Sequence, residues 1–222
     1  MQEINALKKI TSEIKKPITC IIGGSKISTK IKIISNLIKI FDNIIVVGGM
    51  ANAILKSTGI NIGKSICEDS YEPLVKNILK QSKIHNCKIY YPIDVIVSQS
   101  LNGSGIAKKI NEINSNDIIL DIGPKTISSI KDIINNSNTV LWNGPAGYFE
   151  NPNFANGTKE IIKIISHKTS KDKIFSVAGG GETVAVINKF NKLESFTFVS
   201  TAGGAFLEFL EGKELPGIKS IN

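Results

Sequence analysis

The sequence contains no arginine, and lysine supplies all 27 basic residues among its 222. Arginine carries a planar guanidinium group that suits bidentate capture of carboxylates, phosphates and guanine edges. A site of that kind in this chain must therefore use lysine, backbone amides or another chain. Lysine, isoleucine and asparagine are abundant together, which favours a drift in genome composition over selection for charge.

Aromatic residues are scarce at 6%, and no basic run occurs, although the formal net charge is +8. Proteins that bind nucleic acid use clustered basic residues and aromatic stacking platforms, so we expect no nucleic-acid partner. Lysine or asparagine interrupts every apolar run before it reaches the length of a membrane span, so we expect no membrane partner. With 41% hydrophobic residues the chain is too apolar to be disordered.

Cysteine occurs three times, at Cys20, Cys67 and Cys87, without a CxxC pair. An odd number of separated cysteines predicts buried free thiols in a reducing compartment. The N-terminus lacks the apolar core of a signal peptide, and its apolar residues recur at helical spacing over 4–14. We therefore expect a cytoplasmic protein.

Apolar runs that end in glycine alternate with stretches of helical periodicity. Strands are predicted over 18–22, 44–47, 88–91, 95–97, 118–122, 139–142, 174–178 and 196–200, and helices over 26–38, 71–84, 124–134, 155–165, 182–188 and 205–210. A segment within 99–116 could be a helix or a ragged edge strand. The alternation predicts an α/β fold with a mostly parallel sheet.

Glycine turns follow six of the predicted strands. They are Gly23-Gly24, Gly48-Gly49, Gly123-Pro124, Gly144-Pro145, Gly179 to Gly181, and Gly203-Gly204. Ligands of open parallel sheets bind beyond the carboxyl ends of the strands, where free backbone N–H groups suit phosphate oxygens. Six such turns on one expected edge predict an anionic ligand that carries phosphate.

Charged residues near these turns are candidates for contacts with that ligand. Lys26 and Lys30 lie one helical turn apart after the first glycine turn, where they either face a phosphate or belong to a solvated helix face. Asp121, Glu150 and Glu182 stand close to predicted strand ends. Glu182 begins a predicted helix, where it either stabilises the helix N-terminus or holds a metal beside phosphates.

Several motifs in this chain resemble, in the same order, the nucleotide-domain motifs of phosphoglycerate kinases. They are GGSKISTK at 23–30, VGGMA at 47–51, DIGPKT at 121–126, WNGPAGYFE at 142–150, GGGET at 179–183 and STAGGA at 200–205, followed by the C-terminal signature LEGKELPG at 210–217. The resemblance extends over essentially the whole chain. It implies a Rossmann-like three-layer domain that holds Mg-ADP or Mg-ATP.

The resemblance also implies site residues. The nucleotide-binding positions are Gly24, Ser25, Lys30, Gly49, Asn143, Glu150, Gly180, Gly181, Glu182 and Thr183, and the catalytic positions are Lys26, Gly181 and Gly204. Within these sets, Lys30 contacts the nucleotide phosphates and Lys26 the phosphoryl group in flight. Glu150 binds the ribose hydroxyls, and Gly24, Ser25 and Gly49 lie beside the adenine. Gly180, Gly181 and Thr183 offer groups to the phosphates.

Three positions depart from the family pattern. Glu182, the implied magnesium ligand, stands where the family usually has aspartate, and one extra methylene displaces its charge. Val47 and Ala202 stand where glycine is common. The last two changes are small, whereas the first bears on the geometry of the metal.

The resemblance covers one domain of a two-domain family. It implies that residues 1–222 are the nucleotide-binding domain, with an interdomain-type helix over 1–16 and a tail over 212–222 that packs on a missing N-terminal domain. The phosphoglycerate site is expected on that domain.

The implied activity is phosphoryl transfer between 1,3-bisphosphoglycerate and ADP, giving 3-phosphoglycerate and ATP. We expect this chain to bind nucleotide without turnover. One alternative is a non-catalytic remnant or interaction module that keeps the fold. Another, a dinucleotide-dependent oxidoreductase, is disfavoured because no GxGxxG motif opens the first predicted strand–helix–strand unit.

Overall fold

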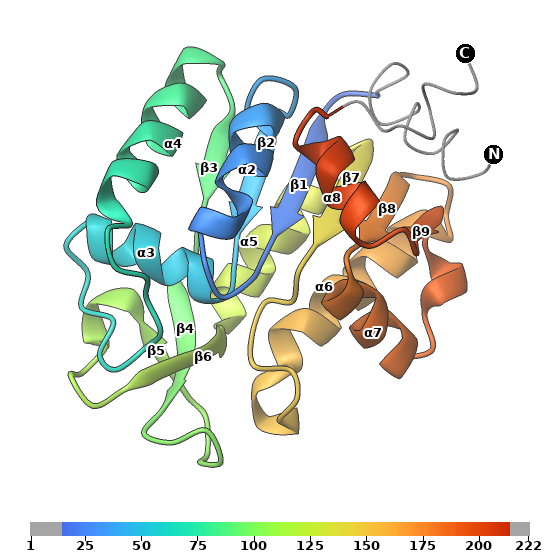
Figure 1. The fold of residues 1–222 in the computed structure, drawn as a ribbon. Helices are drawn as coiled ribbons and strands as arrows, with labels where there is room; N and C mark the ends of the chain where they lie inside the picture. The colour runs from blue at the N-terminus through green and yellow to red at the C-terminus, as the bar shows by residue number, and fades with distance from the viewer. Residues whose placement is uncertain (1–14, 214–222) are drawn as a thin grey trace.

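A central sheet of six parallel strands organises the structure, a computed structural model that describes residues 15–213 (Figure 1). The strands are β1 (Ile18–Ile22), β2 (Asn43–Val46), β3 (Lys88–Tyr90), β7 (Thr139–Asn143), β8 (Phe175–Gly179) and β9 (Phe198–Ser200). Their order in space is β3-β2-β1-β7-β8-β9, and every pairing is parallel. All residues of β1 and β7 are buried, as the continuous apolar runs predict.

Helices cover both faces of this sheet and complete three layers. One face carries α2 (Ile31–Leu37), α3 (Gly49–Ser57), α4 (Glu72–Ile84) and α8 (Gly204–Leu210), and the other carries α5 (Pro124–Asn135), α6 (Asn156–Thr169) and α7 (Gly181–Lys189). Alternate residues of β1 enter the two cores, Cys20 and Ile22 on one face and Ile21 on the other. The predicted three-layer α/β fold is confirmed.

A second sheet of three antiparallel strands is inserted between β3 and β7. It contains β4 (Asp94–Ser98), β5 (Ile106–Lys109) and β6 (Ile118–Ile122), in the order β5-β4-β6. The ambiguous segment within 99–116 is the edge strand β5, followed by the 3₁₀ turn Ile110–Glu112.

The expectation of six glycine turns on one edge is wrong for one of them. Gly123-Pro124 follows β6, which pairs in the antiparallel sheet, so this turn does not join the edge formed by the parallel strands. A short apolar run before a glycine has the same composition in either kind of sheet, which is why the pattern did not separate them.

Other differences concern helices and thiols. Helix α3 was not predicted, because its residues 50–55 are all buried, so no exposed face interrupts the apolar run that follows β2. Three further 3₁₀ turns occur at Ser28–Lys30, Pro152–Phe154 and Leu193–Ser195. The helix predicted over 4–14 and residues 214–222 of the tail lie outside the described residues.

Cys20 and Cys87 are buried, whereas Cys67 is only partly buried, so the prediction of buried thiols is wrong for Cys67. Within residues 15–213, no helix is both long and apolar enough to cross a membrane.

Two buried aspartates fasten the antiparallel sheet to helices of the main body. The carboxylate of Asp94 accepts hydrogen bonds from the backbone N–H groups of Lys125 and Thr126, at 2.9 and 2.7 Å, and so caps the start of α5. The carboxylate of Asp121 accepts a hydrogen bond from the backbone N–H of Gly157 at 2.7 Å, at the start of α6. These contacts fix the antiparallel sheet over the carboxyl edge of the main sheet.

Burial raises the pKa of Asp121 to about 7, although hydrogen bonds from the backbone N–H groups of Gly157, Ile122 and Asn156 favour its ionised form. In the unfolded chain an aspartate titrates near pH ~3.9. Between these two values the folded protein holds a proton that the unfolded chain has released. The stability that this carboxyl contributes is therefore full below about pH 4 and is lost as the pH rises through about 7.

The Asp121→Asn variant removes this titration and keeps an oxygen that can accept the hydrogen bond from Gly157. We expect the free energy of unfolding of the unmodified chain to fall relative to that of the variant as the pH rises, by up to about 1.4 kcal/mol per pH unit. Urea unfolding followed by circular dichroism between about pH 5 and pH 8 measures this difference. If the difference in free energy of unfolding between the two proteins stays constant with pH, the pKa of Asp121 is not raised by folding.

Candidate functional site

The main sheet changes winding direction between β1 and β7. The chain passes from β1 to β2 on one side of this point and from β7 to β8 on the other. In open α/β sheets such a switch point leaves a crevice beyond the carboxyl ends of the two strands, where ligands bind. The turns at Gly23-Gly24 and Asn143-Gly144 therefore border the expected ligand crevice.

These two turns are in direct backbone contact. The N–H of Gly23 donates to the carbonyl oxygen of Asn143 at 2.8 Å. A Cβ on Gly23 would lie 2.2 Å from the carbonyl oxygen of Pro145, and one on Gly144 would lie 2.3 Å from that of Gly23, so any side chain would force the turns apart. The indole N–H of Trp142 donates to the carbonyl oxygen of Gly144 at 2.8 Å and so helps to fix the position of the second turn.

Lys30 joins the turns that meet at the switch point. Its ammonium group donates to the carbonyl oxygen of Gly23 at 2.6 Å and to Oδ1 of Asn143 at 2.5 Å. The amide group of Asn143 in turn donates to the carbonyl oxygen of Gly179 at 2.7 Å, which brings in the turn after β8. Burial lowers the pKa of Lys30 from its ordinary value, and the negative charge of Glu182 opposes this shift. A partly buried positive charge thus stands at the centre of the crevice.

The start of α7 faces the same crevice. Thr183, in the first turn of this helix, accepts a hydrogen bond through Oγ1 from the N–H of Gly144 at 2.7 Å. Gly180 precedes the helix with a φ of +94°, a backbone conformation that favours glycine, and Gly181 is its exposed first residue. The first N–H groups of a helix lack partners within it, so this helix start suits an anion.

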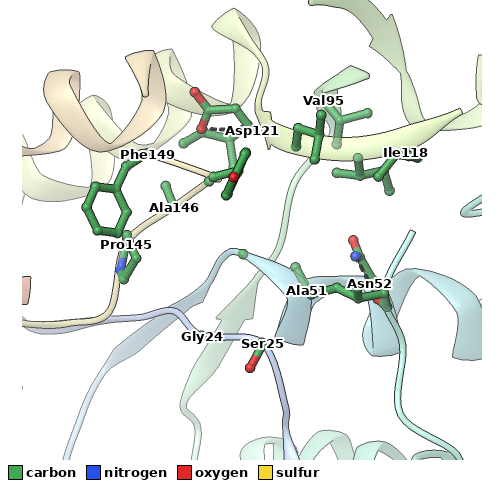
Figure 2. A pocket seen from close by; sticks show the side chains of 18 of the residues that line it. Gly24, Ser25, Ala51, Asn52, Val95, Ile118, Asp121, Pro145, Ala146 and Phe149 are labelled. Atoms are coloured by element: carbon green, nitrogen blue, oxygen red, sulfur yellow. Dashed lines mark hydrogen bonds between the residues drawn. The ribbon is translucent and has the colours of Figure 1, made fainter. Parts of the chain in front are cut away.

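A cavity of 310 Å³ extends from these turns beneath the antiparallel sheet. Figure 2 shows the turn at Gly24 and Ser25 on one side of it and strand β6 on the other, with the segment from Pro145 to Phe149 closing a third side. Its glycine-lined end meets the crevice, and the rest is bordered mainly by apolar side chains. The arrangement offers a phosphate cradle that continues into an apolar slot.

The structure brings most of the predicted site residues together. The cavity lining includes Gly24, Ser25, Gly49, Glu150 and Glu182, and the hydrogen-bond network at the switch point includes Lys30, Asn143 and Thr183. Lys26 is exposed in the segment that follows the first glycine turn and does not border the cavity, and Gly204 is the first residue of α8.

The apolar wall was not predicted. Residues that line it include Asn52 and Ile66 from the region of α3, Val95 from β4 and Ile118 from β6. Glu68 was also missed: its carboxylate accepts a hydrogen bond from the N–H of Ser28 at 2.9 Å and fixes the segment between Lys26 and Lys30.

The residues present fit a magnesium ion that the ligand helps to coordinate. Within residues 15–213, no group of three or more histidine, cysteine, aspartate or glutamate side chains could hold a metal ion. The exposed carboxylate of Glu182 stands alone at the start of α7. Magnesium at nucleotide sites is usually held by one or two carboxylates together with phosphates and water, and a single carboxylate meets that requirement.

Curated phosphoglycerate kinases are similar to this chain in sequence. A phosphoglycerate kinase of Francisella philomiragia is 44% identical over 221 residues, which are 99% of this chain and 55% of that protein. A phosphoglycerate kinase of Wolbachia pipientis is 44% identical over 220 residues, which are 98% of this chain and 56% of that protein. The chain therefore spans about half the length of these curated relatives.

Solved structures agree with this result. The structure of phosphoglycerate kinase from Coxiella burnetii matches with a TM-score of 0.93 at 40% identity, over 98% of this chain and 56% of that chain. The enzyme of the same name from Pyrococcus horikoshii matches with a TM-score of 0.81 at 28% identity, over 99% of this chain and 55% of that chain.

The family model of phosphoglycerate kinase matches residues 1–213. This match covers nearly the whole sequence, and the identities of 44% to named relatives over 98% or more of the chain support it. The chain belongs to the phosphoglycerate kinase family.

Proposed function

We propose that this chain binds Mg-ADP and Mg-ATP as the nucleotide-binding domain, residues 1–222, of a phosphoglycerate kinase. The reaction moves a phosphoryl group between 1,3-bisphosphoglycerate and ADP and gives 3-phosphoglycerate and ATP. The observation that carries the proposal is the Lys30 ammonium group, which is bonded to the turns after β1 and β7 and lies beside Gly24, a residue that lines a cavity of 310 Å³. The proposal includes a cytoplasmic location, which three free thiols support.

The polarity of the site suggests how the nucleotide lies. The base occupies the apolar slot between α3 and β6, and Glu150, at the edge of the same cavity, takes the ribose hydroxyls. The phosphates then reach Lys30 and the start of α7, where Gly181 and Thr183 lie. This orientation puts each part of ADP beside groups of matching chemistry.

Phosphoryl transfer at such a site depends on position and charge more than on a covalent group. Lys30 holds the phosphates near the switch point, and the exposed Lys26 is free to follow the phosphoryl group as it moves. We assign Gly181 and Gly204, the first residues of α7 and α8, to backbone contacts in the same step. Magnesium, when bound beside Glu182, neutralises charge on the phosphates.

The acidic second substrate is expected on a separate N-terminal domain, as the family resemblance implies. We therefore expect nucleotide binding by this chain without turnover. The chain's lack of arginine agrees with this division, because bidentate capture of a carboxylate and phosphates is a task that arginine performs best.

The first test is calorimetric titration of the folded chain with Mg-ADP. We expect one saturable binding event, because the phosphate cradle and the apolar slot adjoin in one site. ATP synthesis from 1,3-bisphosphoglycerate and ADP, measured with the same sample, should be absent. A folded sample with no saturable heat would contradict nucleotide binding, and substantial ATP formation would contradict the expectation of inactivity.

The Lys30→Ala variant should weaken Mg-ADP binding by about 10- to 100-fold, since it removes one charge-assisted contact from a partly desolvated site. Calorimetry measures the change, and thermal unfolding checks that the variant remains folded. Lys32→Ala is the matched control, because Lys32 is exposed on the following helix and contacts neither turn. If the chain is instead a remnant that only keeps the fold, neither substitution changes the response to ADP.

The Glu182→Gln variant tests the proposed magnesium ligand. In the unmodified chain, Mg²⁺ should tighten ADP binding. In Glu182→Gln, the tightening by Mg²⁺ should be about tenfold smaller, because the carboxylate is lost. Binding of metal-free ADP should be unchanged or tighter in this variant. Titrations with and without Mg²⁺ measure the gain, and Glu194→Gln, on an exposed 3₁₀ turn, serves as the control. If Mg²⁺ tightens ADP binding equally in Glu182→Gln and Glu194→Gln, other groups hold the metal.

A further inference from the structure

Glu68 lies in the loop between α3 and α4 and bonds to the segment that carries Lys26. Its carboxylate accepts hydrogen bonds from the backbone N–H of Ser28 at 2.9 Å and from the Ser28 hydroxyl group. Glu68 and Ser28 are 40 positions apart in the sequence, so only folding brings them together. Ser28 begins the 3₁₀ turn Ser28–Lys30, which leads directly into α2. A side chain from a distant loop thus caps this helical start.

The sequence around this turn supplies no cap of its own. Ile27 stands before the turn and its side chain makes no capping hydrogen bond. Neither the 3₁₀ turn nor the first turn of α2 contains an acidic residue. Helical segments are stabilised at this end by an acceptor for their free N–H groups and by negative charge. Glu68 supplies both, so the position of the turn depends on this one carboxylate.

Charge also links Glu68 to Lys26. Burial acts to raise the pKa of the Glu68 carboxyl. Hydrogen bonds from Ser28 and Ile27 and the positive charge of Lys26 outweigh burial and hold this pKa below its ordinary value. The carboxylate is therefore ionised at neutral pH. Because Lys26 is exposed, a phosphate that enters the crevice can attract its ammonium group in competition with Glu68.

The backbone of Lys26 is held on both sides. Before it, the carbonyl oxygen of Gly24 accepts a hydrogen bond from an N–H group of α3 at 2.9 Å. After it, the Ile27 side chain is buried in the core. Oγ1 of Thr29 donates to the carbonyl oxygen of Lys26 at 2.8 Å. The turn that Glu68 caps is therefore bonded directly to the backbone of Lys26.

The loop that carries Glu68 is itself anchored to the antiparallel sheet. The N–H of Lys64 donates to the carbonyl oxygen of Asp117 at 2.7 Å. Oγ of Ser65 accepts a hydrogen bond from the N–H of Ile119, in β6, at 2.8 Å. Glu68 follows these contacts by a few residues, so its carboxylate acts on the turn from a fixed position.

The two lysines of the segment differ in how they are held. The ammonium group of Lys30 has its own partners, the carbonyl oxygen of Gly23 and Oδ1 of Asn143. For Lys26, the bonds described above fix only the backbone. Lys26 directly follows Ser25, which lines the cavity (Figure 2). The place that its ammonium group can reach therefore depends on the turn, and the turn depends on Glu68.

We propose that Glu68 is a positioning residue for phosphoryl transfer, which holds Lys26 where its ammonium group meets the terminal phosphate of ATP. The inference rests on the proposed function, because it requires Lys26 to meet that phosphoryl group. Glu68 acts through Lys26 and not on the nucleotide itself. Its negative charge alone would disfavour phosphate, whereas its cap favours contact with phosphate, so the experiment has to separate charge from cap.

The experiment measures the ratio of the affinities for Mg-ATP and Mg-ADP by calorimetry, because these ligands differ only in the terminal phosphate. In Glu68→Ala the ratio should fall about three- to tenfold, since Lys26 loses its place beside that phosphate. Asp69→Ala is the matched control. Asp69 is the next residue, is exposed and does not bond to Ser28, so its loss removes a similar charge without the cap. The ratio should be unchanged or higher in this control.

A double-mutant cycle tests whether Glu68 acts through Lys26. Lys26→Ala should lower the ratio, and adding Glu68→Ala to it should lower the ratio no further. Thermal unfolding checks that each variant is folded. Ser28→Ala removes one of the two bonds without changing any charge, and it should lower the ratio about twofold even if Glu68→Ala does not fold.

The opposite results are equally definite. If the ratio is unchanged in Ser28→Ala and in folded Glu68→Ala, or in Lys26→Ala, the inference is overturned while the proposed function stands. If Glu68→Ala lowers the ratio as much in Lys26→Ala as in the unmodified chain, Glu68 does not act through Lys26. If the unmodified chain binds neither nucleotide, the proposed function fails, and this inference with it.

Discussion

Contact between the backbones of the turns after β1 and β7 is the constraint on which the rest of the site depends. Gly23 and Gly144 approach so closely that neither has room for a Cβ atom. Their approach brings the carbonyl oxygen of Gly23 close to Oδ1 of Asn143, and a cation between these two oxygens offsets their mutual repulsion. Lys30 supplies it from the side of the crevice, and its bonds to Gly23 and Asn143 then set the positions of the neighbouring turns.

Sequence reasoning recovered the main sheet because a parallel strand buried on both faces is a continuous apolar run that ends where its turn begins. Strand ends also placed five of the six glycine turns correctly at one edge. Spacing left Lys30 either facing a phosphate or on a solvated helix face, and only the family resemblance assigned it to the nucleotide. Helix α3 was missed because its residues 50–55 are all buried and continue the apolar stretch of β2 without an exposed face to mark a helix. The apolar wall was missed because Asn52 and Ile118 line one cavity only through the packing of distant segments, which no local pattern encodes.

The two ends of the cavity use different chemistry. At the switch point the crevice is bordered by the backbone of glycine turns and by one ammonium group, and their geometry depends on residues that lack side chains. In the slot beneath the antiparallel sheet, the surface is made of side chains on α3, β4 and β6. Asp94 and Asp121 hold that sheet in place through the starts of α5 and α6, so the slot depends on two carboxylates outside the phosphate cradle.

The single tryptophan of the sequence occupies an informative position. The Trp142 indole is fully buried, stacks on the Phe196 ring with 6.1 Å between centroids, and donates its N–H to the carbonyl oxygen of Gly144. Indole emission responds to the electric field and hydrogen bonding around the ring. Trp142 is thus a natural fluorophore that one hydrogen bond joins to the turn at the switch point. Its emission spectrum reports on charge that enters the crevice.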